Sequence, residues 1–257
     1  MTGPMGSPRT SPRTSPRTSP RNMAATFRLA TRLFWRDKSM VFASVVTPVG
    51  LAVGMPALMR NVTDVAAATH IFQGALALLL AITAFMNVTV VLAGRRDQLV
   101  LKRLRASRLT DAQILTGQIA GTATQTVIVI VSCTLAVHLV ADVPLPADPV
   151  AFAAVVIAGS AVLSLLGAAY TAAVPRAELA AAFTTPVFLV AGVSAGAMGP
   201  IPLPSWLPPV LGLLPTTAVV DAVRTGELVV PLLILAGWTL AGLAAIRLWF
   251  RWEPRRS

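Results

Sequence analysis

The chain has 257 residues, of which 55% are hydrophobic and 12% are charged, and its formal net charge is +11. A soluble domain carries about 25% charged residues, and here the hydrophobic residues form long uncharged runs. This composition excludes an ordinary soluble domain and indicates an all-α integral membrane protein in a lipid bilayer. Membrane topology explains the positive charge better than nucleic-acid binding does, so we expect no nucleic-acid partner.

The N-terminal segment, residues 1–22, contains a Ser-Pro-Arg-Thr repeat that begins at Ser7. Proline at every fourth position prevents a helix, and almost nothing in the segment is apolar enough to be buried. We expect residues 1–22 to be a disordered tail and residues 23–257 to form the transmembrane domain. The tail lacks the apolar stretch of a signal peptide. Two roles are open for it: a basic tail that is phosphorylated or touches lipid, or a dispensable extension upstream of a start at Met23, which we favour.

Residues 24–38 have the pattern of an amphipathic helix. Arg28, Arg32 and Arg36 recur at every fourth position on one face, and apolar residues such as Phe27 supply much of the other side. A helix of this kind lies in the membrane interface with its arginines among the lipid headgroups. We therefore expect an N-terminal interfacial helix.

Six apolar runs follow, and a helix needs about 20 apolar residues to cross the hydrocarbon core. The expected transmembrane helices are residues 40–59, 71–93, 114–140, 150–174, 181–198 and 229–248. Pro48, Pro56 and Pro186 fall inside them, and each is expected to kink its helix because it removes a backbone hydrogen bond.

The distribution of Lys and Arg sets the expected orientation. With a cytoplasmic N-terminus, the cytoplasmic segments hold every Lys and Arg except Arg60 and Arg224, whereas the acidic residues divide evenly between the two sides. Positive charge confined to one side follows the positive-inside rule. We expect both termini to be cytoplasmic, in a multi-pass protein of a bacterial inner (plasma) membrane.

The segment between the last two expected spans, residues 199–228, is too apolar for an ordinary loop and too rich in proline to span the membrane. An external re-entrant or interfacial hairpin fits it, with Trp206 at headgroup depth. From Pro215 to Arg224 a helix is expected, because proline is favoured in the first helical turn.

Motifs for catalysis by this chain itself are missing. Neither lysine, Lys38 or Lys102, follows a glycine, so the sequence has no phosphate-binding loop for ATP. The histidines His70 and His138 lie near opposite ends of expected spans, and Cys133 is the single cysteine, so we expect neither a metal site nor a disulfide. The expected spans contain no Asp or Glu, which argues against a proton-coupled secondary transporter. We expect a chain that is not an enzyme and holds no cofactor.

Polar residues share one face of the third expected span. Gln118, Thr122 and Gln125 follow the spacing i, i+4, i+7, and Thr83 and Asn87 stand four residues apart in the second span. These side chains could line a substrate path or a dimer seam. Polar residues are also ordinary contacts between membrane helices, so both interpretations stay open.

A basic strip, residues 95–109, lies between the second and third expected spans. Leucines recur among its cations, as in Leu101-Lys102-Arg103-Leu104-Arg105, which predicts an amphipathic helix. Such a helix cannot lie in hydrocarbon. It is either a loop that obeys the positive-inside rule or a docking element for an aqueous partner.

Two motifs resemble those of a known family. The run Leu101-Lys102-Arg103-Leu104-Arg105-Ala106-Ser107, followed by Leu109, is similar to the coupling helix of type-two ABC exporter permeases of the daunorubicin-resistance kind. The segment from Pro215-Thr216-Thr217 to Asp221-Ala222-Val223-Arg224 resembles the signature before that family's last span. The chain departs from the coupling motif at Leu99-Val100 and at Arg108, and it has Arg96 or Asp97 in place of the usual glutamate.

The resemblance implies a permease that pairs as a homodimer and docks onto two separate ABC-type ATPase subunits, which bind ATP and Mg. It implies export of a hydrophobic or amphipathic, drug-like or antibiotic-like substrate between the two halves. Thr83, Asn87, Gln118, Thr122 and Gln125 are the candidates for the substrate path. The candidates for ATPase coupling are Arg96, Leu101, Lys102, Arg103, Leu104 and Arg105. A non-transporting membrane assembly or scaffold protein remains an alternative, and a secondary transporter is a weaker one.

Overall fold

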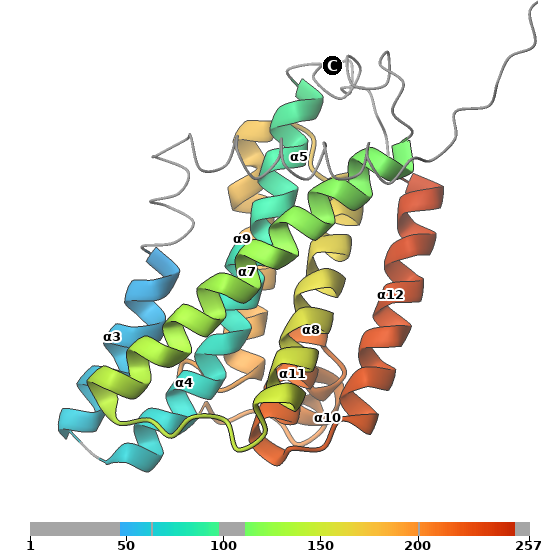
Figure 1. The fold of residues 1–257 in the computed structure, drawn as a ribbon. Coiled ribbons are helices and arrows are strands. Elements are labelled where there is room, and N and C mark those ends of the chain that lie inside the picture. Colours follow the sequence, from blue (N-terminus) through green and yellow to red (C-terminus); the bar gives the residue numbers. More distant parts are fainter. Residues whose placement is uncertain (1–46, 63, 98–110, 200, 250–257) are drawn as a thin grey trace, which may run out of the picture.

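The computed structural model describes residues 47–62, 64–97, 111–199 and 201–249. Within these ranges every regular element is a helix, and the long helices form a single bundle (Figure 1). The expected tail, the interfacial helix at 24–38 and residues 98–110 of the basic strip lie outside the described residues.

The helices follow one another along the bundle with few long connections. In chain order they are α3 (Thr47–Val62), α4 (Val65–Leu80), η2 (Ala81–Met86), α5 (Asn87–Asp97), α7 (Asp111–Ala141), α8 (Pro149–Tyr170), η3 (Ala177–Leu179), α9 (Ala180–Ser194), α10 (Leu207–Gly212), α11 (Pro215–Thr225) and α12 (Val229–Trp249).

Five helical stretches are long and apolar enough to cross a membrane, and they correspond to the second to sixth expected spans. Their bounds are Val65–Asp97, Gln113–Ala141, Pro149–Tyr170, Ala177–Ser194 and Val229–Trp249. The helix α3 coincides with most of the first expected span and contains Pro56, and α9 contains Pro186. The sequence therefore predicted these helices, with shifts at their ends.

The shifts at the helix ends have local causes. The helix α4 begins earlier than expected because the Asp64 carboxylate caps it, accepting a hydrogen bond from the backbone N–H of Ala67 at 2.7 Å. The helix α9 ends at Ser194 rather than at residue 198, and Gly196 then adopts a φ of +69°, a conformation that favours glycine. The fourth expected span ends at Tyr170, four residues early, in a turn.

The second span is not a uniform α-helix. Between α4 and α5 the chain makes a π-helical turn, η2, at Ala81–Met86. At this level α8 comes very close, because a Cβ atom on Gly167 would collide with the carbonyl oxygen of Phe85. The Thr89 hydroxyl donates to that carbonyl at 2.9 Å and also lies 3.0 Å from the carbonyl of Gly167. The π turn and the glycine together join the second span to α8.

Two short helices, α10 and α11, connect α9 to α12 at the end of the bundle where α3 turns into α4 (Figure 1). The predicted helix from Pro215 is confirmed: α11 has Pro215 in its first turn and ends before Gly226, which has a φ of +76°. The helix α11 packs against α4, α8 and α12, and its residues 215–220 are all buried. Trp206, in contrast, is 67% exposed.

Candidate functional site

The end of the bundle at which α5 stops is called the Arg96 end. Arg96 is only 2% exposed. Its guanidinium donates to the carbonyls of Thr171, Val174 and Pro175 at 3.2, 2.9 and 3.2 Å. Its Nε also lies 3.4 Å from Oδ1 of Asp97. A buried guanidinium normally has its donors satisfied, and here the acceptors come from the last turn of α8 and the chain just beyond it.

Asp97 extends the same connection to the next helix. Its Oδ2 accepts a hydrogen bond from the backbone N–H of Ala177 at 2.6 Å. Ala177 begins η3, which continues directly into α9. The last two residues of α5 therefore hold the second span to the turn between α8 and α9. We call Arg96, Asp97 and their acceptor and donor groups the α5 clamp.

The structure thus places Arg96 inside the protein, where it contacts this chain's own carbonyls. The basic strip continues from Gln98, immediately after the clamp. The other five candidates for ATPase coupling lie outside the described residues: Leu101, Lys102, Arg103, Leu104 and Arg105. A displacement of the strip would act on α5 at the point where α5 is bonded to the α8–α9 turn.

The polar face of α7 connects to α5 at the same end. Arg95 donates through Nη1 to Oε1 of Gln118, and Gln118 in turn donates through Nε2 to the Thr122 hydroxyl at 3.1 Å. Gln118 and Thr122 are buried. The Nε2 atom of Gln125, one turn further, is buried and has no hydrogen-bond partner among the described residues. The structure therefore connects Gln118 and Thr122 to the Arg95 guanidinium, whereas Gln125 is not part of this series.

The two path candidates in the second span lie at its π turn. Thr83 is completely buried, and its hydroxyl donates to the carbonyl of Leu79 at 2.6 Å. Asn87, the first residue of α5, is 8% exposed. Hydroxyl back-bonding of this kind is a common way to satisfy Thr within a helix.

The opposite end of the bundle, called here the Arg224 end, has a second arginine that contacts main-chain carbonyls, and its side chain is partly buried. Arg224 of α11 donates through Nη2 to the carbonyls of Ala195 and His70, at 2.8 and 3.4 Å. Its Nε atom is buried and has no hydrogen-bond partner among the described residues. Burial lowers the pKa of Arg224 and raises that of Asp221, and the attraction between the two charges opposes both shifts. Arg224 thus joins α11 to α4 and to the chain after α9.

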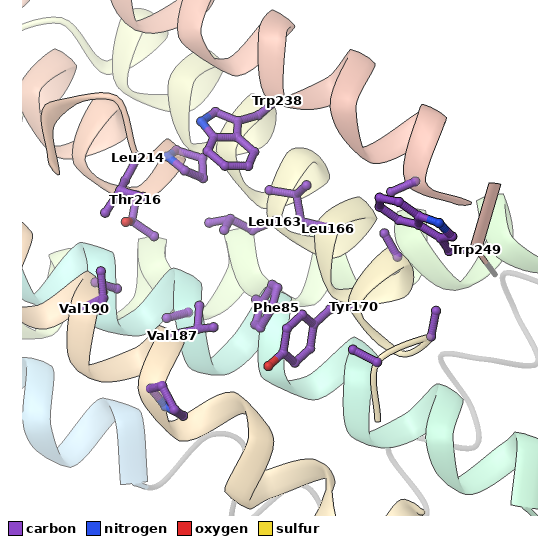
Figure 2. A pocket seen from close by; sticks show the side chains of 18 residues that line it. Phe85, Leu163, Leu166, Tyr170, Val187, Val190, Leu214, Thr216, Trp238 and Trp249 are labelled. Atoms are coloured by element: carbon purple, nitrogen blue, oxygen red, sulfur yellow. The ribbon is translucent and has the colours of Figure 1, made fainter. Parts of the chain in front are cut away.

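A cavity of about 700 Å³ lies between η2, α8, α9, α11 and α12 (Figure 2). Its lining is almost wholly apolar and includes Phe85, Tyr170 and Trp238. None of the five predicted path residues lines it. The sequence pattern did not predict this cavity. Small side chains at lining positions such as Ala169 and Ala245 leave space for it, but alanine is too frequent in this chain to indicate a cavity.

Metal binding has no support among the described residues, which hold no group of three or more His, Cys, Asp or Glu side chains able to share an ion. A comparison with curated proteins gives no match for this chain. A comparison with protein families matches residues 22–228 to the ABC-2 type transporter family, which covers most of the chain, including the α5 clamp and the segment that ends in Arg224. The chain therefore belongs to the ABC-2 type transporter family.

Proposed function

We propose that this chain is the permease subunit of an ATP-driven exporter, and that it moves a hydrophobic or amphipathic compound when docked on a separate ATPase subunit. Family membership makes it a membrane permease of an ABC transporter. The proposal includes three finer statements: the direction of transport is export, the substrate is drug-like or antibiotic-like, and the chain belongs to the daunorubicin-resistance-like subfamily. The partner would supply the ATP and Mg site, since the sequence contains no phosphate-binding loop.

The observation that carries the proposal is the α5 clamp. A docking element can drive transport only if its movement reaches the helices that form the path. The strip follows α5 directly, and Arg96 and Asp97 bond the end of α5 to the turn between α8 and α9. Force on the strip would therefore move three spans as one unit. The role of Arg96 in this proposal is to position α5, whereas Lys102, Arg103 and their neighbours contact the ATPase.

For the substrate path we propose the α7 face, with Arg95 at its mouth. The bonded series Arg95, Gln118 and Thr122 offers donors and acceptors beside apolar helices. An amphipathic compound that reaches this series could place its polar group there, beside side chains that are buried within one copy of the chain. The proposal also includes a homodimer, six membrane spans, an external hairpin formed by α10 and α11, and cytoplasmic termini.

Docking is tested by charge reversal within the strip. Lys102→Glu combined with Arg103→Glu is expected to abolish co-purification with an ABC-type ATPase encoded in a neighbouring reading frame, because it replaces two cations of the contact with anions. Arg255→Glu combined with Arg256→Glu makes the same change of net charge near the C-terminus and serves as the control. Equal co-purification of both variants would contradict the coupling role.

Transport is tested in vesicles that contain the chain and that ATPase. Amphipathic compounds are expected to stimulate ATP hydrolysis, and Gln118→Leu is expected to change which compounds do so. Thr124→Val is the matched control, since Thr124 lies on α7 but is exposed and bonds only its own helix, through the Ala120 carbonyl. Normal insertion and ATPase binding without any stimulation or transport would favour the scaffold alternative.

A further inference from the structure

The apolar cavity is a consequence of how α9 and α12 are placed. The helix α9 packs on α4, η2 and α5, and α12 packs on α8 and α11. The two helices stand apart in the bundle (Figure 1). The helix α12 is held close to α8 at Gly242, where a Cβ atom would come within 3.0 Å of the Leu165 side chain. The space left between α9 and α12 is backed by η2 and α8.

Two of the aromatic residues that line the cavity, Trp238 and Tyr170, have their polar atoms bonded to the protein backbone. The Trp238 indole N–H donates to the carbonyl of Leu213 at 2.7 Å. The Tyr170 hydroxyl donates to the carbonyl of Phe183 at 2.8 Å. Among the described residues, no charged side chain lines the cavity. The rings therefore present carbon to the cavity, and a polar or ionic ligand would lose its hydration there without compensation.

The cavity is elongated along the bundle. Trp238, Leu214 and Thr216 mark one end and Trp249 the other (Figure 2). Trp238 and Trp249 are both on α12, and eleven helical residues span about 16 Å. Both helices that flank the opening, α9 and α12, are long and apolar enough to cross a membrane, which would place the opening beside hydrocarbon. A cavity of about 700 Å³ is within the size range of small-ligand sites.

We propose that this cavity binds one acyl chain of a bilayer lipid, which enters sideways between α9 and α12. The chain runs along the bundle between Trp238 and Trp249, as acyl chains run in the surrounding membrane. This site is separate from the α7 face that we propose for the transported substrate. It lies within one copy of the protein.

The test uses Trp238 as a reporter. The other four tryptophans, Trp35, Trp206, Trp249 and Trp252, are replaced by Phe, and the protein is reconstituted in phosphatidylcholine vesicles whose acyl chains are brominated near their middle. Bromine quenches indole fluorescence on contact, so Trp238 is expected to be quenched. Ala245→Phe is then expected to remove this quenching, because Ala245 lines the cavity two turns from Trp238 on the same face of α12.

Ala244→Phe is the matched control, since Ala244 is the preceding residue and is exposed on the bundle surface. It adds the same volume outside the cavity and should leave the quenching unchanged. Mass spectrometry of the detergent-extracted protein provides the second readout: a retained phospholipid is expected in the parent and in Ala244→Phe, and its loss in Ala245→Phe.

Three results would overturn the proposal. Equal quenching in both Phe variants would mean that Trp238 meets only the surrounding lipid. Absence of quenching in the parent would mean that protein, such as a second copy of the chain, covers the opening. Relief of quenching by a transported compound would assign the cavity to the substrate instead of the lipid. The docking and stimulation experiments on the strip and on α7 can succeed or fail independently of these results.

Discussion

The Arg96 end and the Arg224 end both depend on a guanidinium that donates to main-chain carbonyls of distant segments, but the two guanidinium groups are satisfied to different degrees. Arg96 is almost fully buried, donates to three carbonyls and lies beside Asp97. Arg224 donates to two carbonyls, one of them at 3.4 Å, and its buried Nε atom has no partner in the part of the chain that the structure describes.

The acidic residues beside the two arginines, Asp97 and Asp221, also differ in how well their surroundings suit a carboxylate. Asp97 is exposed to solvent and accepts the backbone N–H of Ala177. Asp221 is in a desolvated position that raises its pKa despite the nearby charge of Arg224. A buried donor without a partner and a desolvated carboxylate both cost free energy. The Arg224 end is therefore expected to be the weaker connection between helices, and the Arg96 end the stronger one.

Removing Arg96 is expected to have the largest effect. Arg96→Ala leaves buried carbonyls without donors, and we expect a loss of about 3 kcal/mol in unfolding free energy, measured by denaturation in detergent. ATPase stimulation should be lost as well. Arg95→Ala is the control for unfolding free energy only, because that side chain bonds Gln118 of the proposed substrate path and not the α8–α9 turn. Equal losses of unfolding free energy in the two variants would contradict the clamp.

Removing Arg224 should cost less than removing Arg96. Arg224→Ala is expected to lower the unfolding free energy by about 2 kcal/mol, since fewer carbonyls lose a donor and one unpaired nitrogen is removed at the same time. The same denaturation measurement in detergent checks this. A loss larger than that of Arg96→Ala would reverse the comparison of the two ends.

A smaller loss of unfolding free energy is expected when Asp97, the acidic residue of the α5 clamp, is replaced. Asp97→Ala removes the acceptor of the Ala177 N–H, and because the site is exposed we expect about 1 kcal/mol. Hydrogen exchange at the start of α9 should report the loosened turn. Asp142→Ala is the control: it removes an exposed ion pair with Arg60 and should change the unfolding free energy by about 0.5 kcal/mol or less. Similar effects in both variants would show that Asp97 does not contribute to the clamp.

The smallest effect is expected at Asp221, and its sign is informative. Because burial raises the pKa of Asp221, the folded state disfavours the carboxylate. That penalty is present above the folded pKa and disappears as the pH falls below the ordinary aspartate value of about 3.9. Asp221→Asn should therefore stabilise the protein slightly at pH 7 and not at about pH 3. Destabilisation at pH 7 would show that attraction to Arg224 outweighs burial.

Much of the fold could be predicted because hydrophobic length sets the span of a membrane helix. The helix at Pro215 was predictable from the preference of proline for the first helical turn. The position of Gln118 and Thr122 on the same face of α7 was predictable from their helical spacing. These features are encoded locally, within one or two turns of the chain.

The remaining features depend on contacts between distant segments. The burial of Arg96 requires carbonyls more than seventy positions away, and in the sequence alone it is one cation among several. The π turn depends on α8 approaching at Gly167. The cavity depends on the separation of α9 and α12, and no single-helix pattern contains that information.

The π turn at Ala81–Met86 has one further consequence, for the direction in which the second span leaves the bundle. A π turn accommodates about one residue more than an α turn, and each residue of an α-helix corresponds to a rotation of about 100°. Deleting one residue there would rotate α5 about its own axis and carry the Arg96 guanidinium away from its acceptors, while Asp64 would still cap α4. The extra residue thus sets the rotation of α5 about its axis, and with it the side of the helix on which Arg96 lies.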